Sequence, residues 1–147
     1  MKELEELIDW QYVMDQPRCV GGHEEVMRAI FGTASVVLAW WSNNDYQGTI
    51  AIAHKLNDGR VVVMTDYYGS CNTCDMWVGA TDEDVRKLVL DLVHHAKTFS
   101  TVGEAADWCA NIDAHEEPHK YPFKAAKYLV EQLMSNEKRE IKGNNHE

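Results

Sequence analysis

Residues 49–67 read TIAIAHKLNDGRVVVMTDY, two runs rich in apolar and β-branched residues that are separated by Asn57-Asp58-Gly59. β-Branched residues favour strands, because their side chains pack well on a pleated surface. Asp-Gly accepts the positive φ angles of a tight hairpin turn. The stretch therefore predicts an antiparallel hairpin made of strands 49–56 and 60–67.

A two-residue turn at Asp58 and Gly59 sets the expected register of this hairpin, with Asn57 facing Arg60. One face is then bulkier and more apolar than the other, and we expect it to lie on the core. A three-residue turn would shift this register. The residues of the expected core face are Ile50, Ile52, His54, Leu56, Val61, Val63, Thr65 and Tyr67. The histidine among them is expected to be a hydrogen-bonded core residue rather than a catalyst.

Segments on both sides of the hairpin complete the expected fold. A strand is predicted at 34–41 (ASVVLAWW), and Thr81 and Thr101 are placed to cap helices. Runs of helices around a small antiparallel sheet indicate the α+β class. We expect a three-stranded antiparallel meander, flanked by two N-terminal and three C-terminal helices that pack on one sheet face. The predicted helices cover 3–14, 23–31, 82–99, 101 to about 112, and about 122 to 138.

The composition is that of a globular protein. The chain has 147 residues, 45% of them hydrophobic, which fits one domain over 1–147 with a frayed tail at about 140–147. No apolar run is long enough for a membrane span, and the acidic start MKELEELIDW is unlike a signal peptide. Four cysteines in such a chain suggest reduced thiols. We therefore expect a cytoplasmic protein.

The negative charge is unevenly distributed. The formal net charge is −10, and residues 61–115 hold nine acidic side chains against three basic ones. This excess disfavours direct binding to nucleic-acid phosphates and favours a protein partner with a basic surface. Exposed tryptophan and tyrosine are also typical interface residues. The predicted interaction surface comprises Asp82, Glu83, Asp84, Asp91, Trp40, Trp41 and Tyr46.

A C-x-x-C pair, Cys71 and Cys74, follows the second strand of the hairpin. We interpret the two cysteines first as reduced thiols packed in a turn, with no cofactor. The alternative is a small binding module stabilised by one zinc ion, because C-x-x-C supplies half of a tetrahedral site and Cys109, His115 and His119 could supply the rest. A redox pair is less favoured, because Asp75 would disfavour a thiolate.

Catalytic motifs are missing from the sequence. There is no G-x-S-x-G nucleophile elbow. The letters H-E-x-x-H occur at 115–119, but Pro118 disfavours the helix that a metalloprotease motif needs. We therefore assign no catalytic residue and expect a non-enzymatic protein.

The segment DYYGSCNTCD, residues 66–75, resembles a motif of small uncharacterised proteins of bacteriophages and their hosts, of the form DYYGSC-x-x-CD. The resemblance spans roughly residues 45–99 and carries over no catalytic or binding residue. It implies a phage-type accessory protein, which would act in the host cytoplasm. Many such proteins bind and block a host enzyme or defence complex, and acidic ones sometimes mimic the charge of DNA.

Overall fold

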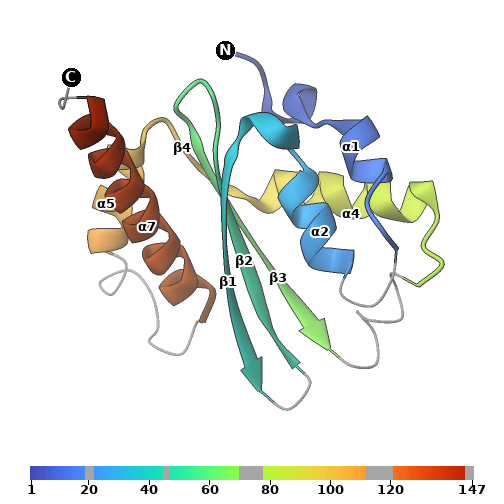
Figure 1. Ribbon diagram of the computed structural model, residues 1–147. Coiled ribbons are helices and arrows are strands. Elements are labelled where there is room, and N and C mark those ends of the chain that lie inside the picture. Colours follow the sequence, from blue (N-terminus) through green and yellow to red (C-terminus); the bar gives the residue numbers. More distant parts are fainter. Residues whose placement is uncertain (19–21, 45–46, 70–77, 112–120, 145–147) are drawn as a thin grey trace.

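A computed structural model describes residues 1–18, 22–44, 47–69, 78–111 and 121–144. Its described elements form a mixed α+β fold around one antiparallel sheet (Figure 1). The helices are η1 (Leu4–Leu7), α1 (Trp10–Met14), α2 (Gly22–Ala29), η2 (Gly32–Ala34), α4 (Asp82–His95), α5 (Val102–Ala110) and α7 (Tyr121–Asn144). The strands are β1 (Val36–Asn44), β2 (Gln47–Lys55), β3 (Val61–Gly69) and β4 (Lys97–Phe99).

The sheet confirms the α+β class and the three predicted strands, and adds a fourth strand. The strand order is β1-β2-β3-β4, and every neighbouring pair is antiparallel. The short strand β4 pairs with the start of β3, where Val61 faces Phe99. The sequence placed these residues in the last turn of a helix. Instead, Ala96 leaves helical geometry with ψ 146° and ends α4 at His95.

The predicted register of the hairpin is wrong by one residue. Lys55 faces Val61, and the amide of Leu56 donates to the carbonyl of Arg60, so the turn has three residues rather than two. Gly59 has a φ of +94°, the left-handed conformation that closes such a three-residue hairpin loop. Side chains alternate along a strand, so a shift of one residue reverses the two faces of β3. Val62 and Met64, rather than Val61 and Val63, therefore lie in the same core as Ile50 and Ile52.

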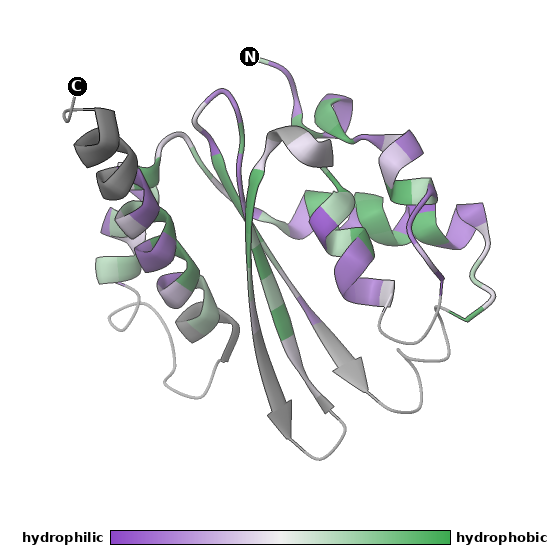
Figure 2. Ribbon diagram, viewed as in Figure 1, coloured by the Kyte–Doolittle hydropathy of each residue, from purple (hydrophilic) through white to green (hydrophobic). Residues whose placement is uncertain are grey.

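Helices cover both faces of the sheet, which corrects the expectation of helices on one face. Figure 1 shows the sheet edge-on, with α1, α2 and α4 on one side and α5 and α7 on the other. The first core contains Ile50, Ile52, Val62 and Met64 of the hairpin. The second core contains the opposite faces of the same strands, including the small residues Ala51, Ala53, Val61 and Val63. In Figure 2, α4 and α7 carry hydrophobic and hydrophilic residues together, as helices at a surface do.

The N-terminal segment forms two short helices rather than one. Ile8 and Asp9 are not helical and separate η1 from α1. The carboxylate of Asp9 accepts a hydrogen bond from the amide of Tyr12. Asp9 thus caps α1 at its own start. Farther along, α7 is longer than predicted and continues to Asn144. Within the described ranges, every helix is too short or too polar to cross a bilayer.

Candidate interaction surface

All four acids predicted for the interaction surface lie on α4 and are exposed. Asp82, Glu83 and Asp84 occupy its first turn, where the positive end of the helix dipole favours negative charge. Asp84 also closes a capping box: its carboxylate accepts from the amide of Thr81 at 3.0 Å, and its own amide donates to the Thr81 hydroxyl at 3.1 Å. These hydrogen bonds from Thr81 lower the pKa of Asp84, which keeps the carboxylate charged.

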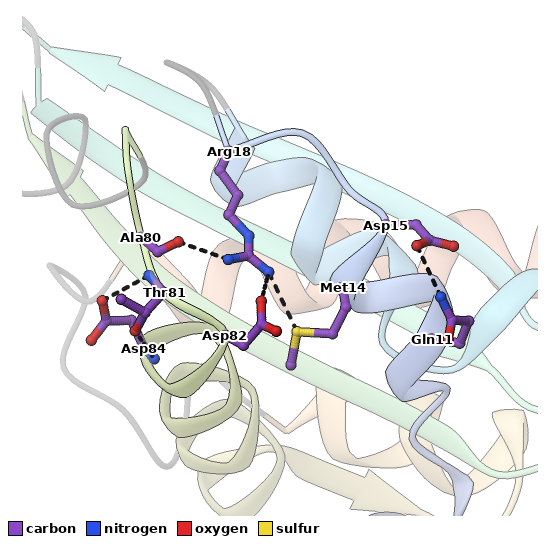
Figure 3. A network of polar contacts seen from close by, with 8 residues as sticks. All are labelled: Gln11, Met14, Asp15, Arg18, Ala80, Thr81, Asp82 and Asp84. Carbon is purple, nitrogen blue, oxygen red and sulfur yellow. Dashed lines mark hydrogen bonds and ion pairs between the residues drawn. The ribbon is translucent and has the colours of Figure 1, made fainter.

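Asp82 is held by Arg18, which connects the end of α1 to the start of α4 (Figure 3). One guanidinium nitrogen of Arg18 donates to the carbonyl of Ala80 at 2.7 Å, and the other contacts both Asp82 and the sulfur of Met14. The charge of Asp82 is therefore partly neutralised by Arg18, and the pair connects the segment after α1 to the start of α4. Glu83, between the two engaged aspartates, has no ion pair with any described residue.

Replacing Arg18 by alanine is expected to lower the free energy of unfolding by about 1–2 kcal/mol, because the buried carbonyl of Ala80 loses its donor. Lys87→Ala, an exposed change on α4, is the matched control and should stay within about 0.5 kcal/mol. Urea unfolding of both variants measures the difference. Equal costs would show that the Arg18 contacts contribute nothing.

Three glutamates at the N-terminus extend the acidic surface from the other end of α4. A groove of about 510 Å³ lies between the N-terminal segment and the end of α4, and the side chain of His94 contacts Glu5 across it. These segments are more than 80 residues apart in the sequence, so their proximity could not be inferred from spacing. The groove is lined by Glu3, Leu4, Glu5, Glu6, Val93, His94, Ala96 and Thr98.

We call the helices that cover the first core the acidic layer, and its described residues are 1–18, 22–30 and 78–96. This layer holds eleven acidic and five basic side chains. Two of the five bases are already occupied by acids of the same layer: Arg18 by Asp82, and Arg28 by Glu24 at 2.7 Å. The excess of negative charge therefore faces solvent with few cations available to balance it.

The predicted aromatic part of the surface is less well supported. Trp40 is half-buried and packs against the second core, on the other side of the sheet from the acidic layer. The backbone of Trp41 belongs to β1, but its side chain lies outside the described part of the structure, as does Tyr46. The acids of α4 and Trp40 thus belong to different faces of the molecule.

Of the five predicted metal ligands, the structure describes only Cys109. Cys71, Cys74, His115 and His119 lie outside the described residues. Cys109 is buried in the second core, where burial, and next the negative charge of Glu131, raise the pKa of its thiol to about 11. The described residues contain no group of three potential ligands, and one zinc ion bound by the C-x-x-C pair stays a prediction.

Two histidine contacts were not predicted from the sequence. The imidazole of His23, buried in the first turn of α2, lies 2.8 Å from the carboxylate of Asp66 on β3. His54 is buried as expected, and its ring joins Ser35 at 3.2 Å to the carbonyl of Met27 at 3.0 Å. Each contact links residues 19 to 43 positions apart, and no spacing rule indicates such pairs.

The contact between Ser35 and His54 lacks the chemistry of a catalytic pair. The carbonyl of Met27 can only accept, so Nε2 of His54 donates to it and Nδ1 accepts from the hydroxyl of Ser35. Burial lowers the pKa of His54 to about 4, which makes the ring a weak base. The ring of His54 is therefore better suited to joining β2 to α2 through Met27, and to the start of β1 through Ser35, than to activating a nucleophile.

Comparisons of this chain with protein-family models, with curated proteins and with solved structures gave no match.

Proposed function

We propose that this protein is an acidic, non-enzymatic interaction module that binds a basic surface of a partner protein through its acidic layer. The observation that carries the proposal is the convergence of two acidic segments that are distant in sequence. The N-terminal glutamates and the acids of α4 lie on the same side of the sheet, joined by the contact between Glu5 and His94. Blocking of a host enzyme or defence complex, as the phage motif implies, would follow from occupying such a basic surface.

The spacing of the acids supports a broad contact rather than a single ion pair. An α-helix rises 1.5 Å per residue, so Asp82 and Asp91 lie about 13 Å apart along α4. That separation exceeds the Debye length of about 8 Å at physiological salt. Each acid therefore interacts mainly with its own local cation. A basic groove of similar length, such as a nucleic-acid binding face of a protein, would match this pattern.

The test reverses exposed charges outside the two main polar contacts at the start of α4. The triple variant Glu6→Lys, Glu83→Lys and Asp91→Lys avoids the cap at Asp84 and the Arg18–Asp82 pair. Against a partner captured from host lysate, we expect this variant to bind at least about 100-fold more weakly than the unmodified protein, mainly through slower association. Association rates measured at low and at physiological salt should also fall with salt for the unmodified protein.

A matched control keeps the net charge change constant. Asp107→Lys, Glu131→Lys and Glu137→Lys make the same reversal on α5 and α7, on the other side of the sheet. Glu137 is 4.0 Å from Lys55, a pair too exposed to matter much for stability. This control should retain most of the affinity. If association ignored salt, or if both triple variants lost affinity equally, the acidic layer would not be the binding surface.

A further inference from the structure

The strand β1 is a long edge with nothing described beside it. It lies at the end of the strand order and pairs with β2 over all nine of its residues, from Val36 to Asn44. On a strand paired on one side only, alternate residues point their N–H and C=O groups outward. No described backbone group outside the sheet bonds to this outer side. In Figure 1 the helices lie to either side of the sheet, and no described helix runs across the β1 edge.

The β1 edge has none of the features that usually prevent strands from pairing. Natural edge strands are short, or carry charges, prolines or bulges that stop another strand from adding. Residues 36–44 read VVLAWWSNN, with no charge, proline or glycine. At the opposite edge, β4 has only three residues and an exposed lysine at its start, and the part of β3 that β4 does not cover, residues 64–69, carries the charge of Asp66 and ends in a glycine. The contrast between the two edges indicates that β1 is built for pairing.

We propose that β1 pairs with β1 of a second copy of this chain, antiparallel and about a two-fold axis. Among the described strands, β2 is paired along its length on both sides, whereas β3 is paired with β4 only at Val61–Val63. Residues 64–69 of β3 therefore form a second open edge, but it is shorter and carries the charge of Asp66, so β1 offers the longer, uncharged edge that two copies can share. Such self-pairing is isologous, the commonest form of dimer interface. It would join two four-stranded sheets into one continuous sheet of eight strands.

The charge distribution permits this dimer in spite of the net charge of −10. Of the acidic layer, α4 packs near β3 and α2 near β2, whereas the helix that packs most against β1 is α7, which is not part of that layer. The strand itself is uncharged, so no like charges meet along the new ladder. Val36, on β1, is also one of the few large apolar residues that are exposed, at 43%. A dimer would present two acidic layers to a partner. The pairing of β1 does not depend on the proposed function of those layers.

The first experiment measures mass and amide exchange together. Light scattering coupled to gel filtration, from about 1 µM to 1 mM, should show a mass approaching twice 16.8 kDa as concentration rises. Residue-resolved hydrogen exchange of the unmodified protein should show alternate amides of 36–44 gaining at least about tenfold protection over the same range. A protein that stays monomeric throughout, or a dimer in which these amides gain no protection, would overturn the proposal.

Two valine variants locate the interface. Val36→Lys puts a charge on the β1 edge, and Val78→Lys makes the same change at another exposed valine, 58% exposed and outside the sheet. We expect Val36→Lys to raise the dimer dissociation constant at least about tenfold, because charge on an edge opposes pairing. Val78→Lys should leave the constant unchanged. Equal effects of the two substitutions would place the dimer contact elsewhere and reject the β1 edge.

Discussion

Leu129→Ala is expected to lower the free energy of unfolding by about 3–5 kcal/mol, the upper part of the range for buried leucines. Leu129 lies on α7 with 0% of its surface exposed, in the second core. The sheet offers Ala51 and Ala53 on this face, so large side chains from α7 must fill the layer. Removing one of them leaves a cavity that short alanines beneath it cannot close.

The control for this prediction lies on the same helix. Glu131→Ala, two residues along and exposed, should change stability by less than about 0.5 kcal/mol. Both variants can be compared by urea unfolding at neutral pH. Similar effects at the two positions would mean that α7 does not pack on the sheet through the Leu129 face, and that the second core is misplaced.

Acid is expected to destabilise the protein through His54 before most carboxylates titrate. Burial lowers the pKa of His54 to about 4 in the folded protein, against about 6.5 in an unfolded chain. Between pH 4 and 6.5, His54 is mostly protonated in the unfolded chain and mostly neutral in the folded protein. The free energy of unfolding should therefore fall as the pH drops from about 6.5 to 4, by about 3 kcal/mol in total for this residue. Above pH 6.5 this contribution is fully present.

Substitution by glutamine isolates the contribution of His54. His54→Gln keeps a side-chain N–H that can donate to the carbonyl of Met27, but it cannot titrate. Its stability at neutral pH should fall, because the edge-to-face contact with Phe31 is lost, while its decline between pH 6.5 and 4 should be shallower than that of the unmodified protein. Urea unfolding at a series of pH values measures both slopes.

Exposed histidines provide the comparison for the acid experiment. His95→Gln removes a titratable ring at the end of α4 whose side chain is largely exposed, and it serves as the control variant. Asp58, whose pKa is lowered by a side-chain hydrogen bond from Arg60, contributes equally to both histidine variants and cancels in the comparison. If His54→Gln and His95→Gln had the same pH dependence, proton binding at His54 would not control acid stability.

The local elements were predictable because their signals lie within a few residues of one another. Thr81 caps α4 and Thr101 caps α5, as expected, since each hydroxyl accepts from an amide only three residues ahead. The strands of the hairpin were found from their β-branched residues, and the burial of His54 from its apolar neighbours. The acids of α4 are exposed for the same local reason, because they lie opposite the apolar stripe of the helix.

What depended on distant contacts was decided only by the tertiary structure. The hairpin register turned on whether the loop had two or three residues, which the sequence Asn-Asp-Gly does not decide and which the pairing of Lys55 with Val61 settles. Residues 97–99 continue the helical pattern of α4 in the sequence, but they form strand β4 because they pair with Val61–Val63 of β3. Sequence alone thus determined the three long strands, the main helices and the exposed acids of α4. The pairing of Arg18 with Asp82, the partners of His54 and the second helical layer required the chain to bring together residues whose distance along it carries no signal.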